Sequence, residues 1–259
     1  MLTEVKEGYV KSEFHSGITT IEFFHPQSNS LPGRLLEELA HAIHGAGNDE
    51  HTKVVILRSA GEKAFCAGAS FDELRTIKDK EQGLHFFSGF AHVINAIRTS
   101  PKFIIGRIHG KCAGGGVGLA AAVDYAIAVE AVEIKLSELA IGIGPFVVGP
   151  AIERKIGLSA FTQLAIDAVM WRNADWARRK GLFAELHPNV EGMDESIRRL
   201  ADTLMHSSPE AMAEMKKIFW KGTEHWDKLL IERAAISGRL ALSEYTKKAI
   251  EKFKSKKQD

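Results

Sequence analysis

The segment that decides the fold is "IHGKCAGGGVGLAAAVDYAIAVEAVEIKLSE", residues Ile108–Glu138. It sets three consecutive glycines, Gly114–Gly116, after an apolar run, follows them with alanines, and reaches Glu138 after two more short apolar runs. Glycine costs more backbone entropy on folding than any other residue, so a run of three indicates that bare backbone is needed there. Three interpretations compete: a phosphate-binding loop, a tight strand–helix packing point, or a peptide N–H exposed to a ligand.

The pattern excludes both common phosphate-binding loops. The P-loop motif GxxxxGK[ST] needs a Lys followed by Ser or Thr, and no such pair follows the glycines. The dinucleotide motif GxGxxG needs a third glycine at the position that Leu119 occupies. What remains is a strand, a glycine turn and a helix that begins at "VGLAAAVD", with unpaired N–H groups and a positive dipole end at its N-terminus. Tight packing and ligand contact both stay open for this segment.

A second segment, "SAGEKAFCAGASFDEL" (Ser59–Leu74), repeats the arrangement. It follows the apolar strand "VVILRS" and carries Ala67-Gly68-Ala69 before another helix start. Two strand-to-helix turns built of small residues can each present one N–H to the same oxygen. Two converging donors are what the stabilisation of an oxyanion requires.

The order of "AFCAGASF", "HGKCAGGGVGLAAAVDYAIA" and "KLSELAIGIGP" resembles the crotonase superfamily, the enoyl-CoA hydratase/isomerase family. The segment "HPQSNSLPGRLLEEL" is similar to the N-terminal segment of that family. The resemblance implies a spiral of ββα units, assembly as a homotrimer or a dimer of trimers, and an acyl-CoA thioester substrate. It also implies an enolate held by two backbone N–H groups. No cofactor is expected, because CoA enters as part of the substrate.

The resemblance also assigns residues to the site. The oxyanion donors would be the N–H groups of Ala69 and Gly115, and the acid/base would be Glu138. The stretch "KAFCAG" resembles the part of the family that lines the adenine and pantetheine path, mainly through its backbone. Six residues are therefore expected to contact the substrate: Phe65, Ala67, Gly68, Gly114, Gly118 and Phe146.

One carboxylate of the family's catalytic pair is missing. Hydratases of this family carry two glutamates, and this chain has Gly118 at the first position and Glu138 at the second. Adding water requires both activation of the water and delivery of a proton, and a positioned acid or base contributes about 10²–10⁴-fold. Moving a double bond from position 3 to position 2 needs only one base. The sequence thus favours isomerisation, while hydration, decarboxylation and thioester hydrolysis stay open.

A second departure from the family follows Glu138. Where the family has "IPGAGG", this chain has "GPFVVGP", Gly144–Pro150. Phe146 and the two valines after it should make the pocket drier and narrower, which raises the pKa of a carboxylate and strengthens it as a base. The alternative is that Phe146 only packs against a neighbouring helix.

Other polar residues near the two turns are interpreted as structural. Asp72 and Glu73 suit a helix start through the helix dipole, and Ser70 suits the cap of a helix that begins at Phe71. Four further residues are interpreted as turn, ion-pair or packing residues: Asp124, His109, Cys66 and Cys112.

Hydrophobic periodicity predicts the remaining elements. The first half alternates strands and helices, and the part after Gly149 is mostly helical with one short strand at "AELH". This order predicts an α/β fold. The expected elements are a hairpin at 8–25, helices at 31–47 and 81–98, and buried strands at 53–60, 102–108, 124–129 and 133–138.

We expect two parts, a ββα spiral core over residues 1–190 for acyl-CoA binding and catalysis, and a C-terminal helical trimerisation subdomain over 191–259. In the second part Trp220, Trp226 and Leu229 suit a surface that an oligomer covers.

Composition bounds the partners and the compartment. The formal net charge is +1 over 259 residues, which gives no general attraction to nucleic acid or anionic lipid. Two cysteines without metal spacing suit a reducing compartment and predict no metal site. No stretch has the length of a membrane span or the apolar region of a signal peptide. We therefore expect a cytoplasmic protein with no nucleic-acid and no membrane partner. The alternative to an enzyme is a non-catalytic acyl-CoA-binding protein on the same scaffold.

Overall fold

Three successive ββα units form the core of the computed structural model, which describes residues 7–255. In each unit one strand joins a large sheet, the next strand joins a small sheet, and a helix follows. This is the spiral expected from the sequence. The units are β3 (Val54–Ser59), β4 (Ala64–Cys66), α2 (Phe71–Leu74) and α3 (Lys80–Thr99); β5 (Phe103–Ile108), β6 (Lys111–Ala113) and α4 (Gly115–Ala122); and β7 (Tyr125–Val129), β8 (Glu133–Lys135), the 3₁₀ turn η1 (Leu139–Ile141) and α5 (Gly149–Ile166).

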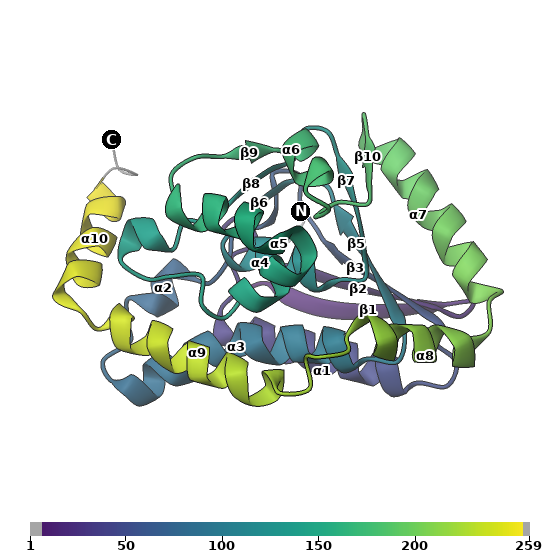
Figure 1. The fold of residues 1–259 in the computed structure, drawn as a ribbon, viewed down its shortest axis with the longest axis horizontal. Coiled ribbons are helices and arrows are strands. Elements are labelled where there is room, and N and C mark those ends of the chain that lie inside the picture. The colour runs from purple at the N-terminus through teal and green to yellow at the C-terminus, as the bar shows by residue number, and fades with distance from the viewer. Residues whose placement is uncertain (1–6, 256–259) are drawn as a thin grey trace, which may run out of the picture.

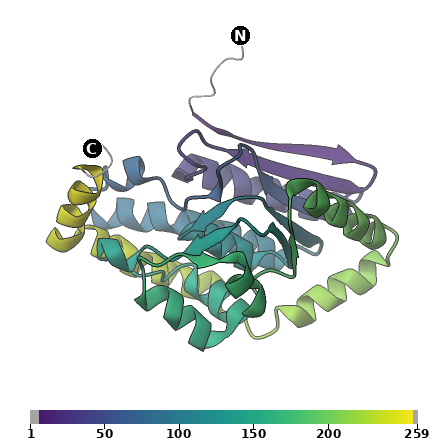
Figure 2. The ribbon, with the colours of Figure 1, turned by 90° about the horizontal axis from the view of Figure 1, so that it is seen from above.

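The large sheet has the strand order β1-β2-β3-β5-β7-β10. Its edge is the antiparallel hairpin of β1 (Tyr9–His15) and β2 (Ile18–Phe24), and the strands from β2 to β10 (Glu185–His187) run parallel. Figure 2 shows the hairpin at the margin of the molecule. Ser16 and Gly17 both have positive φ, as a two-residue turn matched to the strand twist requires. The central strands β3, β5 and β7 are mostly buried, which explains their continuous apolar runs.

The small sheet positions the turns that the sequence singled out. Its order is β4-β6-β8-β9, with the first three strands parallel and β9 (Arg172–Asn173) antiparallel. Cys66 lies opposite Cys112, and Cys112 lies opposite Ile134. Because the carboxyl ends of parallel strands meet at one edge of a sheet, the three segments that follow these strands emerge side by side.

Three long helices pack against one another. α1 (Gly33–Asn48) packs against α3, and α9 (Trp226–Ala241) lies along α3 (Figure 1). The α3–α9 crossing is close, since a Cβ on Gly83 would lie 2.8 Å from the Cα of Gly238. The other helices are α6 (Ala174–Arg179), α7 (Val190–Met205), α8 (Pro209–Phe219) and α10 (Glu244–Ser255).

A kink in α5 and the burial of Trp226 are two local features of the helical part. Gly157 interrupts α5 with a φ of 77°, so two helical segments meet there at a kink. The expectation that Trp226 lies at an exposed face is wrong. Trp226 is 5% exposed and packs edge-on against Trp220, because this side of α9 is turned toward the core.

The main hydrophobic cluster crosses the predicted boundary at residue 190. It joins the three ββα units to Met193 and Ile197 of α7 and to Leu230 and Ala234 of α9. The boundary itself stays a prediction. Within residues 7–255, no helix combines the length and the apolar character that crossing a bilayer requires.

Candidate active site

Three backbone segments meet at the end of the small sheet. Ala69 and Gly115 each follow by three residues the paired Cys66 and Cys112, and Glu138 stands shortly after β8. The parallel pairing of β4, β6 and β8 therefore places the three segments at one level. The three residues that the sequence assigned to the reaction are thus neighbours.

Contacts between the glycines of the two turns and Glu138 confirm this proximity. A Cβ built on Gly68 would lie 3.2 Å from the backbone nitrogen of Gly115, and one built on Gly114 would lie 3.0 Å from Oε1 of Glu138. The backbone N–H of Gly114 donates to the carbonyl of Lys135 in β8, at 2.9 Å. The first turn, the second turn and the acid are thus packed against one another.

The N–H groups of Ala69 and Gly115 are left available by the local backbone. Ala69 forms an isolated parallel bridge with Leu31, in which Leu31 N–H donates to the carbonyl of Gly68 (2.7 Å) and Ser70 N–H donates to the carbonyl of Leu31 (3.0 Å). Both bonds involve the neighbours of Ala69, so its own N–H points away from Leu31. Gly115 opens α4, where a helix leaves its first N–H groups unpaired. Within the described chain, neither N–H donates to a protein acceptor.

Packing explains why the triplet is made of glycines. Gly114 has a φ of 51°, a conformation that side chains disfavour. A Cβ on Gly115 would collide with the ring of Phe90, and one on Gly116 would collide with the carbonyl of Cys66. The tight-packing interpretation therefore holds, and Gly114 and Gly115 also line a cavity.

A cavity of about 80 Å³ lies against this N–H pair. Glu138 is the only ionisable side chain among the described residues that line it, and the two polar neighbours are Ser137 and Ser237. The rest of the lining is backbone of the two turns and apolar side chains. Those side chains are Phe71, Leu74, Phe86, Phe87, Phe90, Ile141, Ile143, Pro145, Phe146, Val147 and Val148.

Glu138 is held by its backbone and is poorly solvated. Its carbonyl accepts hydrogen bonds from the N–H groups of Ile141 (3.2 Å) and Ile143 (3.0 Å), which fix the 3₁₀ turn that follows. The carboxylate oxygen Oε2 is inaccessible to solvent and has no hydrogen-bond partner in the described part of the chain. Burial raises the pKa of Glu138 from 4.5 to about 7, against a smaller lowering by its own backbone N–H. A group that titrates near neutrality can both accept and return a proton.

Gly118 does not line the cavity. A Cβ on Gly118 would lie 2.5 Å from Cγ1 and 2.7 Å from Cβ of Val148, which stands just before α5. Val148 lines the cavity together with Phe146 and Val147. The wall next to Gly118, where the sequence expected a substrate contact, is therefore formed by Val148.

The predicted binding residues of the first turn divide into two groups. Ala67 and Gly68 line the cavity. Phe65 does not, because its side chain is fully buried and packs edge-on against Phe23 with ring centroids 5.5 Å apart. A ligand could meet Phe65 only through its backbone.

The acids near the first turn serve the helices. Ser70 caps α2 by accepting a hydrogen bond from the N–H of Glu73 (3.3 Å), as the sequence predicts. The Glu73 carboxylate accepts from the N–H of Gly33 at the start of α1 (2.7 Å), and Asp72 accepts from the side chain of Gln27 (2.7 Å). Neither acid lines the cavity, so neither stands in for the missing carboxylate.

Sequence reasoning expected Val148 at the pocket, but it missed Phe86 and Phe87 from α3 and Ser237 from α9. The pair Phe86-Phe87 is visible as two adjacent aromatics, but only the docking of α3 turns them toward the turns. In the part of the chain that the structure covers, no group of three or more His, Cys, Asp or Glu could hold a metal ion.

Comparison with known proteins identifies the family. The family model described as enoyl-CoA hydratase/isomerase matches residues 13–258. The human mitochondrial methylglutaconyl-CoA hydratase is 31% identical over 190 residues, which cover 73% of this chain and 55% of that protein. Carnitinyl-CoA dehydratase of Escherichia coli (strain K12) is 26% identical over 248 residues, 89% of this chain and 93% of that protein.

Solved structures share the fold. The crystal structure of enoyl-CoA hydratase from Bacillus halodurans superposes with a TM-score of 0.87 at 23% identity, and covers 94% of this chain and 99% of that one. At this identity the likeness speaks for the fold, which is the crotonase spiral. Together with the match of the family model over nearly the whole chain, it leads to one conclusion: this chain belongs to the enoyl-CoA hydratase/isomerase family.

Proposed function

We propose that this chain moves the double bond of a 3-enoyl-CoA to position 2, with Glu138 carrying the proton. The observation that carries the proposal is that Glu138 is the only ionisable group among the described residues that line the cavity. One base is sufficient, because the carboxylate that removes the proton from the α-carbon can return it to the γ-carbon. The acyl-CoA substrate class accords with the family.

The two free N–H groups supply the second requirement of this reaction. The thioester oxygen accepts hydrogen bonds from Ala69 and Gly115, and the dienolate that forms places its charge on this oxygen. The N-terminus of α4 adds the positive end of its dipole. Losing one such donor typically lowers the rate of an enzyme by about 10²–10³.

The apolar wall suits proton return rather than water addition. Phe146, Val147 and Val148 exclude solvent, so the proton taken by Glu138 stays on it until it reaches the γ-carbon. Burial also makes the carboxylate a stronger base toward a weak carbon acid. A nucleophilic water would need a second polar group, and Val148 fills the space beside Gly118.

Hydration of a 2-enoyl-CoA is the second candidate. It is favoured by the printed names of the relatives, a hydratase and a dehydratase. In this chain Glu138 would have to serve both the water and the α-carbon, since no other lining residue in the described chain can exchange a proton in that role.

The direct experiment offers 3-enoyl-CoA and 2-enoyl-CoA separately and follows the absorbance of the conjugated thioester. Its appearance from the 3-enoyl substrate, lost in Glu138→Gln, supports isomerisation. Its disappearance from the 2-enoyl substrate with no isomerisation would replace the proposal by hydration.

A separate measurement addresses the non-catalytic acyl-CoA binder. In D₂O the wild type should exchange the α-hydrogens of a saturated acyl-CoA, and Glu138→Gln should not. Tight acyl-CoA binding without exchange of the α-hydrogens and without turnover would mean that the chain is a non-catalytic acyl-CoA-binding protein.

A further inference from the structure

A second cavity of about 380 Å³ lies at the C-terminal end of α4, whereas the candidate active site lies at its N-terminal end. It opens at the amino ends of β5 and β7 of the large sheet. The active-site turns instead follow the carboxyl ends of β4 and β6 of the small sheet. α5, α7 and α8 contribute its other walls, and none of its lining residues lines the active-site cavity. Its volume falls within the range of about 300–1,000 Å³ that is usual for small-molecule sites.

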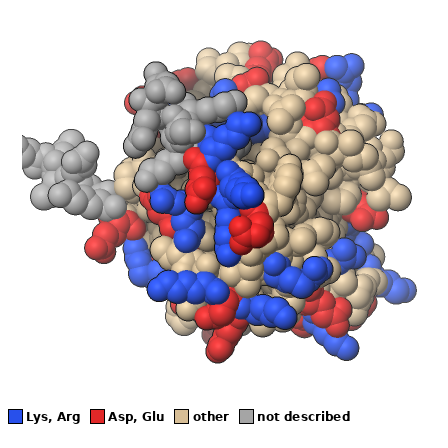
Figure 3. All heavy atoms as spheres, turned by 90° about the vertical axis from the view of Figure 1, so that its left-hand side faces the viewer, with Lys and Arg blue, Asp and Glu red and all other residues tan. Residues whose placement is uncertain are grey.

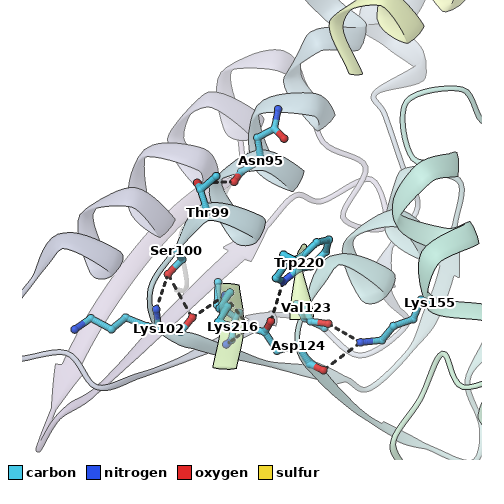
Figure 4. A network of polar contacts seen from close by, with 10 residues as sticks. Asn95, Thr99, Ser100, Lys102, Val123, Asp124, Lys155, Lys216 and Trp220 are labelled. Carbon is cyan, nitrogen blue, oxygen red and sulfur yellow. Dashed lines mark hydrogen bonds and ion pairs between the residues drawn. The ribbon is translucent and has the colours of Figure 1, made fainter. Parts of the chain in front are cut away.

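Asp124, which lines this cavity, belongs to a buried ion pair (Figure 4). Oδ2 of Asp124 accepts hydrogen bonds from Nζ of Lys216 (2.8 Å) and from the N–H of Ile104 (2.8 Å), and Oδ1 accepts from Nε1 of Trp220 (3.3 Å). Lys216 is 2% exposed and also donates to the carbonyl of Lys102 (2.7 Å). The single charge of Asp124 is therefore already used by Lys216.

Lys155 brings a second ammonium group to the backbone beside Asp124. Its Nζ donates to the carbonyls of Val123 (2.9 Å) and Asp124 (3.1 Å) at the end of α4. An ammonium carries three protons, so these two bonds leave one N–H, and Lys155 lines the cavity. Burial lowers the pKa of both Lys155 and Lys216, and Asp124 is the one carboxylate that opposes this in each case.

The cavity thus has an excess of positive charge. Among the described residues that line it, Asp124 is the only acid, against Lys155 and Arg154. Arg154 lies over the ring of Trp220 and donates to the backbone carbonyl of Phe219 at the rim. A partly buried ammonium without its own counter-charge is unfavourable, and an anion would relieve this.

We propose that this cavity binds an aliphatic monocarboxylate, with the carboxylate on Nζ of Lys155 and the hydrocarbon along the apolar walls. Phe103, Ile105, Leu200 and Leu204 form those walls. The single remaining N–H of Lys155 beside a mostly apolar surface matches one carboxylate. A phosphate would need several more donors. The inference does not depend on the reaction at Glu138.

The test measures binding of octanoate and of octan-1-ol by calorimetry while saturated acyl-CoA occupies the active site. The wild type should bind octanoate once per chain and at least tenfold more tightly than octan-1-ol. Lys155→Met should weaken octanoate at least tenfold and leave octan-1-ol unchanged. Lys180→Met, which removes an exposed lysine elsewhere, should change neither. Leu204→Trp should fill the cavity and weaken both ligands.

Three results would overturn the proposal. Equal affinity of the wild type for the acid and the alcohol would leave Lys155 as the cap of α4 only. Loss of octanoate binding when acyl-CoA is added would place the ligand in the active site. Octanoate binding that appears only when an oligomer dissociates on dilution would show that a second copy fills the cavity. If the Lys155→Met variant does not fold, Leu204→Trp provides the test instead. Unchanged octanoate binding by Leu204→Trp would then overturn the proposal.

Discussion

Glu138 is the proposed base of the reaction, and its burial sets its pKa. Replacing it by Gln removes the base but keeps the shape of the side chain, so turnover of 3-enoyl-CoA should fall by at least about 10²–10⁴-fold. Because the base must be ionised and burial raises its pKa to about 7, kcat/KM of the wild type should rise with pH up to about 7 and then level off. A pH profile of initial rates measures this. A plateau that already begins near pH 5 would contradict the burial of the carboxylate.

The same buried group should make stability depend on pH. Between 4.5, the ordinary pKa, and about 7, the folded chain binds more protons at Glu138 than the unfolded chain does. The free energy of unfolding therefore falls as pH rises through this window. At pH 8 Glu138→Gln should be more stable than the wild type by up to about 3 kcal/mol, from 1.36 kcal/mol per pKa unit. Urea denaturation measures the difference, and at pH 4.5 the two proteins should be equally stable.

Single residues were predictable where a motif marks them and not where a contact does. The two turns and Glu138 stand in quotable segments, and the parallel pairing of Cys66 with Cys112 then brings them to one level. The contact of Val148 with Gly118 joins residues thirty positions apart, and only the docking of α5 on α4 creates it. The burial of Phe65 against Phe23 likewise depends on β2 lying beneath the turn.

At the scale of elements, the contact between Gly118 and Val148 lets α4 and α5 pack closely together. Gly118→Ala should destabilise the fold by about 1–3 kcal/mol, because its methyl group overlaps Val148. Val148→Gly should remove the overlap, because only the Cα of residue 148 then faces the new methyl group, at 3.7 Å. The double variant should therefore be more stable than the sum of the single changes predicts, by about 0.5–3 kcal/mol. A double-mutant cycle in urea measures this coupling. Additive effects would mean that α5 shifts instead.

The crossing of α3 and α9 depends on two glycines. Gly83→Ala should destabilise by about 1–3 kcal/mol, because the new methyl group meets the backbone of Gly238, which cannot move aside as a side chain can. Gly45→Ala in α1 is the matched control. It meets nothing within 4 Å and should stabilise by about 0.5–1 kcal/mol. Thermal denaturation of both variants would decide, and similar shifts in both would argue against the close crossing.

Element existence was largely predictable from periodicity, but orientation was not. The hairpin and the buried strands follow from apolar runs and turn residues. The two-residue strand β9 was missed, since it owes its existence to the neighbouring edge of β8. Trp226 on α9 points inward because it packs against Trp220 and the main hydrophobic cluster. No local sequence pattern indicates this orientation.

For the whole molecule, the surface charge agrees with the balanced composition. On the face that carries α10, positive and negative side chains are interspersed (Figure 3). Apolar exposure is more local. Met215 (46%), Ile218 (67%) and Phe219 (51%) stand exposed on α8, next to the second cavity. An exposed patch of this kind is typical of a contact surface.

The last prediction concerns assembly, which the family resemblance implies as a homotrimer or a dimer of trimers. If α8 takes part in it, Ile218→Asp would bury a charge at the contact and should shift the protein toward smaller species in light scattering. Thr203→Asp, at an exposed position of α7, is the control and should leave the distribution of species unchanged. Unfolding is expected to stay one transition in both, because the core joins α7 and α9 to the spiral. An unchanged mass for Ile218→Asp would mean that copies meet through another surface, and the exposed Leu158, Ile166 and Val169 around α5 would then be tested in the same way.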